Sequence, residues 1–441
     1  MPIDLNPKCR ARITELIAAA LGKIKVQHGK FVTRNSEGQV PLILANEALP
    51  QRGPIHDKLV AYIDEYPLVE FVYDTLADEL RDAEFMQGEE PQGLVTVPGY
   101  QDPAAVAARL VEEFVALPRE YKLTFQLPHD VREALPPEKD RHDLSVRMRL
   151  IRSSAELAIE LPLIAANEDA EQRLKGGSLL SLIGSPPLQW TEGAVHLQLD
   201  ASGFVGMYGG SMPDLEARRV LRSFCGLGLA LRMFDTNNRY SPYPPRHHYF
   251  VHRLELDGST WCVRDRLELD DSLSRGIERL KMHSVNGWID SPEKQASWPA
   301  RILNEMANVF SAGQKSDAIL LASQWYFDSV TGPDQLLQYV QAMVTLEILL
   351  GDKASPKEIG LNELLRNRCA YLIGSSQEER TEIHKLFGEI YDVRSQIVHR
   401  GKHRLDMNER LLLGRLRLMC RRVIQKEVDL LIADKKEERA S

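Results

Sequence analysis

Cysteine is scarce in this chain of 441 residues, and the spacing of the few that occur excludes two kinds of stabilising site. The five cysteines show no C-x-x-C pair and are scattered along the chain, at Cys9, Cys225, Cys262, Cys369 and Cys420. A disulfide framework or a structural zinc site needs paired or clustered cysteines. We therefore interpret the five as separate buried thiols, and we expect neither a metal nor another cofactor.

Long apolar runs are also missing. No stretch approaches the roughly 18 apolar residues that a membrane-spanning helix needs. The N-terminus has no basic segment followed by an apolar core and a cleavage site, so Arg12–Leu21 is expected to form an amphipathic helix of the mature protein. With 43% apolar and 27% charged residues, the composition is typical of a soluble globular protein. We expect a cytoplasmic protein with no membrane partner, built from two or three domains.

Acidic residues outnumber basic ones, but unevenly along the chain. The net charge is −8, yet residues 297–441 contain 21 Lys and Arg against 20 Asp and Glu, which leaves the excess of acid in residues 1–296. Ten basic residues fall between Arg394 and Lys426, where Asp406 and Glu409 are the only acids. Such a cluster is what a phosphate-binding surface requires. A solvated helix face explains a charge run equally well.

The first 296 residues mix helical and strand patterns and predict an α+β region with room for two subdomains. Asp102–Leu117 has helical spacing, and Asp214–Phe234 predicts a long helix. Alternating patterns predict half-buried strands at Tyr121–Leu127 and Val195–Val205. The dipeptide Asp257-Gly258 between two further alternating runs predicts a β-hairpin.

Strand signals fade after Ser291-Pro292, and residues 297–441 predict an all-α helical bundle. Ser375 with Glu378, and Asp406 with Glu409, have the spacing of a capping box at a helix start. Glycines 351, 374 and 401 stand where helices are expected to end. The six expected helices are Trp298–Ser311, Ser316–Ser329, Asp334–Leu350, Ile359–Ile373, Gln377–Val398 and Met407–Ala433.

Two charged residues interrupt apolar stripes in this bundle. Arg394 falls within the stripe of the Gln377–Val398 helix, and Glu347 falls within that of the Asp334–Leu350 helix. Burying either charge without a partner costs on the order of several kcal/mol. We therefore expect the two charges to pair with each other. A plain structural salt bridge and a functional polar site both fit this pattern.

His399 lies at the end of the same predicted helix and is followed by Arg400 and Gly401. The helix macrodipole stabilises an imidazolium there, which suits a residue that donates a proton to a leaving oxygen. Five positions on an ideal helix correspond to a rotation of about 140°, so Arg394 and His399 do not share a face. They converge only if the helix end is irregular or if a second copy of the chain completes the site. A lone histidine at a helix end is more often a cap.

These residues are similar to a known family. The string Tyr391-Asp-Val-Arg-Ser-Gln-Ile-Val-His-Arg-Gly401 resembles the signature of the HEPN superfamily, specifically its Apea-like branch. The order of three upstream segments strengthens the resemblance, which covers the last third of the chain: Leu320–Asp328, Leu346–Leu350 and Arg368–Gly374. The R-x(4–6)-H motif of the family matches Arg394 and His399, and its buried helix acid matches Glu347.

The resemblance implies a metal-independent endoribonuclease that acts as a two-fold homodimer through the C-terminal bundle. RNA supplies its own nucleophile, the 2′-OH, so the protein needs a proton handler, His399, and a cation for the developing phosphorane, Arg394. Arg400, Lys402 and Arg404 would hold flanking phosphates of the RNA. Family members are often defence or toxin effectors, in which case residues 1–296 form the sensing or regulatory region for an unknown trigger.

Two other interpretations stay open. The bundle can be a catalytically silent HEPN module for dimerisation or nucleotide binding, a reading favoured by Ser395, which stands where many members carry Asn, Asp or His. Alternatively, the chemistry lies in residues 1–296. That region has no P-loop motif, and Gly226-Leu-Gly228 fits helix packing better than a dinucleotide fingerprint. We interpret His247, His248 and His252 as ordinary strand-edge residues without a metal.

Overall fold

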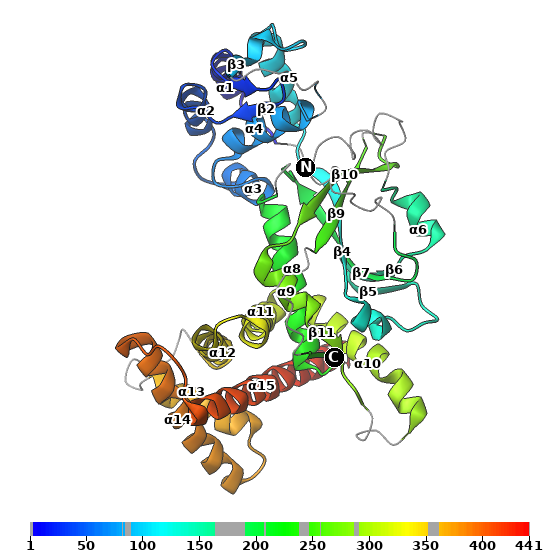
Figure 1. Ribbon diagram of the computed structural model, residues 1–441, viewed down its shortest axis with the longest axis vertical. Coiled ribbons are helices and arrows are strands. Elements are labelled where there is room, and N and C mark those ends of the chain that lie inside the picture. Colours follow the sequence, from blue (N-terminus) through cyan, green and yellow to red (C-terminus); the bar gives the residue numbers. More distant parts are fainter. Residues whose placement is uncertain are drawn as a thin grey trace.

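The interior of the protein is divided into two hydrophobic cores. The computed structural model describes residues 3–81, 83, 90–163, 190–206, 209–237, 247–255, 257–285, 291–351 and 361–440. One core is built from residues 3–117 together with Phe204, and the other extends from Tyr121 to Leu431. The second core therefore continues across residue 296, where the sequence predicts a domain boundary. Figure 1 shows the N-terminal helices and small sheet at one end of an elongated molecule, the larger sheet in the middle and the helical bundle at the far end.

The N-terminal unit packs helices around a small antiparallel sheet of order β2-β1-β3. The side chain of Asn6 caps the first helix of this unit, and that of Asp102 caps its last helix. Its elements are α1 (Pro7–Leu21), β1 (Lys25–Gln27), β2 (Phe31–Thr33), α2 (Ser36–Glu47), α3 (Pro54–Tyr62), α4 (Pro67–Glu79), β3 (Gln92–Gly93), η1 (Leu94–Thr96) and α5 (Pro103–Val115).

A six-stranded antiparallel sheet of order β10-β9-β4-β7-β6-β5 forms the middle of the molecule. The predicted hairpin is confirmed: Gly258 has φ +71°, and the Asp257 carboxylate accepts hydrogen bonds from the backbone N–H groups of Ser259 and Thr260. The strands are β4 (Arg119–Gln126), β5 (Arg141–Ser145), β6 (Met148–Arg152), β7 (Val195–Gly203), β9 (His248–Leu254) and β10 (Trp261–Glu268).

The two faces of this sheet differ in chemistry. One face carries apolar side chains, among them Leu123, Leu197 and Val251, and packs with α8 (Met212–Ala230) in the second core. The other face is polar but equally buried, with Lys122, Thr124, Arg149, His196, Gln198 and His252 all below 9% exposure. Figure 1 shows α8 on one side of the sheet and the short helix α6 (Ala155–Glu160) on the other. The polar face must therefore satisfy its charges and hydrogen bonds internally.

Helix α8 ends earlier than the sequence pattern predicts. Arg232, with φ +61°, turns the chain, and Phe234 begins β8 (Phe234–Thr236), which pairs with β11 (Leu280–Met282). Within α8, Gly226 lies at the crossing with α11 (Asp317–Thr331), where an added Cβ would stand 1.8 Å from the carbonyl oxygen of Ser323. Gly228 faces the ring of Phe234. The expectation that Gly226-Leu-Gly228 serves helix packing is confirmed.

The C-terminal part is helical, as predicted. Helix α10 starts earlier than expected, at Pro292, and the last helix extends to Ala440. The capping box of Asp406 and Glu409 is confirmed. The predicted box of Ser375 and Glu378 is not formed: Ser376 caps the helix by accepting from the Glu379 N–H, and the Glu379 carboxylate accepts from the Ser375 N–H. No helix in the described ranges is long and apolar enough to cross a membrane. Helix α9 (Asp271–Glu278) precedes β11. The helices of the C-terminal part are α10 (Pro292–Phe310), η4 (Gly313–Ser316), α11, α12 (Gln335–Leu350), α13 (Leu361–Ile373), α14 (Gln377–Arg400) and α15 (Met407–Ala440).

Charged residues join the N-terminal unit to the sheet. Arg264 of β10 donates a hydrogen bond to Asp78 of α4 (2.7 Å), and Arg81 donates one to Asp265 (2.9 Å). Asp74, on the same helix, lies 3.7 Å from Arg34 and against the backbone of Gly206. Burial, reinforced by the neighbouring Glu70 carboxylate, raises the pKa of Asp74 to about 6.

This raised pKa predicts that Asp74→Asn stabilises the protein at neutral pH. A carboxyl whose pKa is higher in the folded state favours folding in its protonated form, and that contribution is lost as the pH rises from about 4 through 6. At pH 7.5 we expect the Asn variant to have a free energy of unfolding about 1–3 kcal/mol higher than the wild type. At pH 4 the difference should vanish. Urea denaturation at both pH values measures this, with the exposed Glu65→Gln as control. An equal effect of Asp74→Asn at both pH values contradicts the prediction.

Candidate functional site

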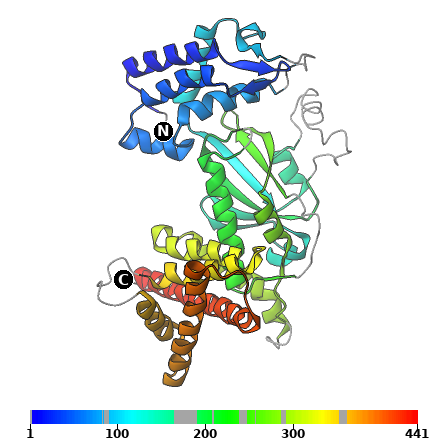
Figure 2. The ribbon, with the colours of Figure 1, turned by 60° about the vertical axis from the view of Figure 1, so that its left-hand side comes forward.

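Helix α14 brings the predicted site residues to the end of the molecule that is farthest from the N-terminal unit (Figure 2). Its first turn is fixed by the Ser376 side chain, which accepts a hydrogen bond from the backbone N–H of Glu379 at 3.1 Å. The predicted apolar stripe then holds the helix in the bundle, with Ile383, Phe387 and Ile390 buried. Tyr339 of α12 adds a hydrogen bond from its hydroxyl to the Ile390 carbonyl, at 3.2 Å.

The structure brings Arg394 and Glu347 together, and the expected ion pair between them is confirmed. Arg394 Nη2 lies 3.3 Å from Glu347 Oε1, with side-chain exposures of 22% and 23%. The guanidinium also stands 5.9 Å from the ring centre of Tyr391, one turn earlier on α14. The pair is therefore only partly shielded from water.

His399 and Arg400 form the exposed last turn of α14. The helix stays regular up to Arg400 and ends at Gly401, which has φ +63°. This regularity excludes an irregular helix end, which was one of the two ways in which Arg394 and His399 could meet. A regular helix separates residues five apart by about 140°, so the two side chains point in different directions. Within one chain, His399 does not join the Arg394–Glu347 pair.

The three predicted phosphate-binding residues differ in their surroundings. Arg400 and Arg404 are exposed. Lys402, in contrast, is engaged: its Nζ lies 2.7 Å from Glu409 Oε1 and 3.3 Å from the side-chain oxygen of Gln396. Because Glu409 also caps α15, Lys402 fastens the loop between the two helices. The exposed positive charge next to His399 comes from the two arginines.

An apolar strip lies on the surface beside this motif. On α15, Met407, Leu411 and Leu418 repeat at spacings of four and seven residues and are exposed by 71%, 63% and 49%. Gly414 lies between them, and no heavy atom of the described residues comes within 4 Å of an added Cβ. Val398, at the end of α14, is also exposed. Exposed apolar residues at this spacing are typical of a helix that packs on another surface.

The interpretation of the histidines as strand-edge residues needs correction. Strand β9 lies inside the sheet, between β10 and β4. His252 is fully buried, and its Nε2 donates to the Pro162 carbonyl at 3.1 Å. Strand β4 comes from more than a hundred residues earlier, so the local sequence carries no sign that it covers this edge. Across the part of the chain that the structure describes, no group of three or more His, Cys, Asp or Glu side chains could hold a metal ion.

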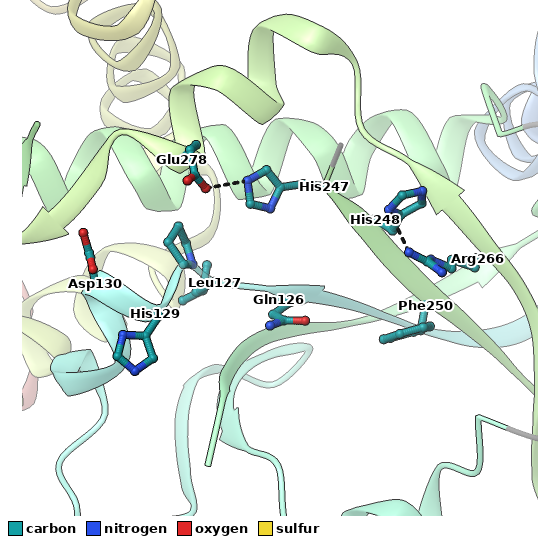
Figure 3. Close-up of a pocket in the computed structure, with 10 residues that line it drawn as sticks. Gln126, Leu127, His129, Asp130, His247, His248, Phe250, Arg266 and Glu278 are labelled. Atoms are coloured by element: carbon teal, nitrogen blue, oxygen red, sulfur yellow. Dashed lines mark hydrogen bonds and ion pairs between the residues drawn. The ribbon is translucent and has the colours of Figure 1, made fainter. Parts of the chain in front are cut away.

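A cavity of about 390 Å³ at one end of the sheet, which we call the sheet-end cavity, was not anticipated from the sequence (Figure 3). The closely spaced His247 and His248 were its only sequence signal. It is formed by β4, the short helix η2 (His129–Ala134), β9, β10 and α9. The described residues that line it are Gln126, Leu127, Pro128, His129, Asp130, His247, His248, Phe250, Arg266 and Glu278.

Comparisons with known proteins add no relative: no family model, no curated protein and no solved structure matches this chain. The resemblance to the HEPN superfamily rests on the residues of the sequence.

Proposed function

We propose that this protein is a metal-independent endoribonuclease in which Arg394 and His399 act on the scissile phosphate. The observation that carries the proposal is the arrangement at the end of α14. A guanidinium oriented by Glu347 is followed by an exposed imidazole and by the exposed cations Arg400 and Arg404. These are the groups that RNA cleavage by its own 2′-OH requires, namely an acid or base for proton transfer and a cation for the phosphorane.

The proposed reaction needs no external nucleophile. The 2′-oxygen attacks the adjacent phosphorus, its proton leaves to a base, and the P–O5′ bond breaks as the 5′-oxygen accepts a proton from the His399 imidazolium. The products are a 2′,3′-cyclic phosphate and a 5′-hydroxyl. Arg394 stabilises the negative charge that builds on the phosphoryl oxygens. Glu347 positions Arg394 and does not itself contact the RNA.

A homodimer supplies what one chain lacks. Since α14 is regular, the Arg394 of one copy and the His399 of another are the pair that can face one phosphate. The exposed strip of Met407, Leu411 and Leu418 provides an apolar surface on which a second copy would pack about a two-fold axis. The N-terminal unit and the sheet would then regulate this effector, in a defence or toxin role.

The test is cleavage of labelled RNA by the purified protein in EDTA, with and without cell extract as a source of trigger. We expect cleavage products with 2′,3′-cyclic phosphate ends. Arg394→Ala and His399→Ala should each lower the rate about 10²–10⁴-fold. His403→Ala is the matched control, since His403 is an exposed histidine four residues further on. RNA with 2′-O-methyl groups should resist cleavage.

Mixing the two inactive variants tests the composite site. If each site combines Arg394 of one copy with His399 of the other, heterodimers of the Arg394→Ala and His399→Ala chains contain one intact site, and activity returns in part. Continued inactivity of the mixture contradicts the shared site. Absence of cleavage in the wild type under all conditions, with the protein folded, favours the alternative of a catalytically silent dimerisation or nucleotide-binding module.

A further inference from the structure

The sheet-end cavity has two chemically different ends (Figure 3). At one end stand Arg266, His248 and the ring of Phe250. At the other end stand Glu278 with His247, and Asp130 with His129. The side chain of Gln126 lies between the two groups. With a volume of about 390 Å³, the cavity falls within the range of small-molecule sites.

Hydrogen bonds fix the cationic end. Arg266 Nη2 donates to Nδ1 of His248 at 3.1 Å. Because Nδ1 accepts, Nε2 of His248 carries the hydrogen, and it donates to Glu268 at 3.2 Å. Among the residues that the structure describes, this relay engages one N–H of a guanidinium that has five, which leaves donors for an anion. Phe250 pairs directly with Arg266 across β9 and β10, and both side chains project from the same face of the sheet.

Carboxylates and imidazoles form the other end. Glu278, the last residue of α9, lies 3.2 Å from Nε2 of His247, while the Nε2 of His129 contacts Arg132 at 2.5 Å. Carboxylates accept hydrogen bonds and donate none when ionised, so this end favours a ligand group with N–H or O–H donors. Imidazoles add acceptors or donors according to their tautomer.

We propose that the sheet-end cavity binds a nucleoside monophosphate. The phosphate takes the guanidinium of Arg266, since Arg recognises phosphate through paired hydrogen bonds. The exocyclic amino and ring N–H groups of the base donate to Glu278 and Asp130, as carboxylates accept from amino groups of bases. Phe250 supplies an apolar surface. The sugar lies between the phosphate and the base, next to Gln126. A free amino acid has its two charges only a few bonds apart, and inorganic phosphate fills one end only.

Contacts connect the cavity to the helical bundle. Gly276, on the same helix as Glu278, packs against Phe327 and Thr331 of α11. Arg279, which follows Glu278 in the chain, donates a hydrogen bond to the Thr331 carbonyl at 3.2 Å. Helix α11 packs on α12, which carries Glu347. A ligand held by Glu278 thus acts on a helix that is in direct contact with the bundle. That consequence for RNA cleavage rests on the proposed function, whereas binding itself does not.

Calorimetric titration of the full chain with AMP, GMP, CMP and UMP tests the proposal without RNA. We expect at least one monophosphate to bind, with the matching nucleoside and inorganic phosphate each at least about tenfold weaker. Arg266→Gln should weaken binding about tenfold or more. Gln126→Trp should block the cavity, and folding tolerates it because Gln126 is exposed. Arg253→Gln, on the neighbouring strand β9 and outside the cavity lining, is the control.

Three outcomes overturn the proposal: no monophosphate binds, binding is unchanged in both Arg266→Gln and Gln126→Trp, or free amino acids bind as strongly as the monophosphates. The titration also separates this proposal from the previous one. A protein that binds a monophosphate but cleaves no RNA contradicts the proposed function alone. A protein that cleaves RNA but binds no monophosphate contradicts the cavity proposal alone.

Discussion

Replacing Gly226 by alanine is expected to destabilise both the sheet and the bundle. The added Cβ would stand 1.8 Å from the Ser323 carbonyl oxygen and 2.6 Å from its carbonyl carbon. These are backbone atoms of α11, which cannot rotate away as a side chain can. The two helices would have to separate, opening the core that they share with Phe224 and Phe327. Losses of this kind are on the order of 4 kcal/mol or more.

Urea denaturation followed by circular dichroism measures the effect of Gly226→Ala on the free energy of unfolding. Gly414→Ala is the matched control, since Gly414 lies in α15 and the added Cβ meets no heavy atom within 4 Å in the part of the chain that the structure describes. That substitution should raise the free energy of unfolding by about 0.5–1 kcal/mol, because alanine restricts the unfolded chain and favours helix. An unchanged midpoint for Gly226→Ala shows that α8 and α11 are not in close contact.

The second large expected effect is a loss of folding stability at acid pH, caused by two histidines on the polar face of the sheet. Burial lowers the pKa of His196 and of His252 to about 4, and the nearby Lys122 contributes for His252. A histidine whose pKa is lower in the folded state adds stability above its unfolded pKa of about 6.5. That contribution is lost as the pH falls toward 4, because these histidines become protonated in the unfolded chain while they stay neutral in the folded one.

The expected loss of stability between pH 7 and pH 4 is on the order of 5 kcal/mol for the two histidines together. This is a large part of the 5–15 kcal/mol or so that holds a typical domain folded. Urea midpoints at several pH values measure it. Trp190 is a suitable fluorescent reporter, since its ring lies 6.2 Å from that of His252, nearly parallel.

Substitutions test whether His196 and His252 cause the loss of stability at acid pH. In the double variant of His196→Gln and His252→Gln, the neutral amides do not titrate, and stability should depend less on pH between 7 and 4. His403→Gln, at an exposed position, should leave the dependence as in the wild type. If the double variant keeps the full dependence of the wild type, other groups cause the acid loss.

Local patterns were sufficient for much of the fold. The Asp257-Gly258 hairpin, the capping box of Asp406 and Glu409 and most helix limits follow from rules that act within a few residues. The Arg394–Glu347 pair was also predictable, because a charge in an apolar stripe needs a partner and the two helices offered opposite signs. The core that the sheet shares with the helical bundle was not predictable, since it depends on α8 meeting α11 about a hundred residues later.

By itself, the sequence determined the helical character of the last third, the hairpin and the pairing of Arg394 with Glu347. The tertiary structure decided the rest of the site. A regular α14 turns His399 away from Arg394, and Glu409 draws Lys402 out of the exposed basic surface. Strands β4, β9 and β10 with α9 enclose the sheet-end cavity. The physical reason is that periodicity fixes which face of an element is apolar, whereas the partner of that face is selected among distant segments by packing.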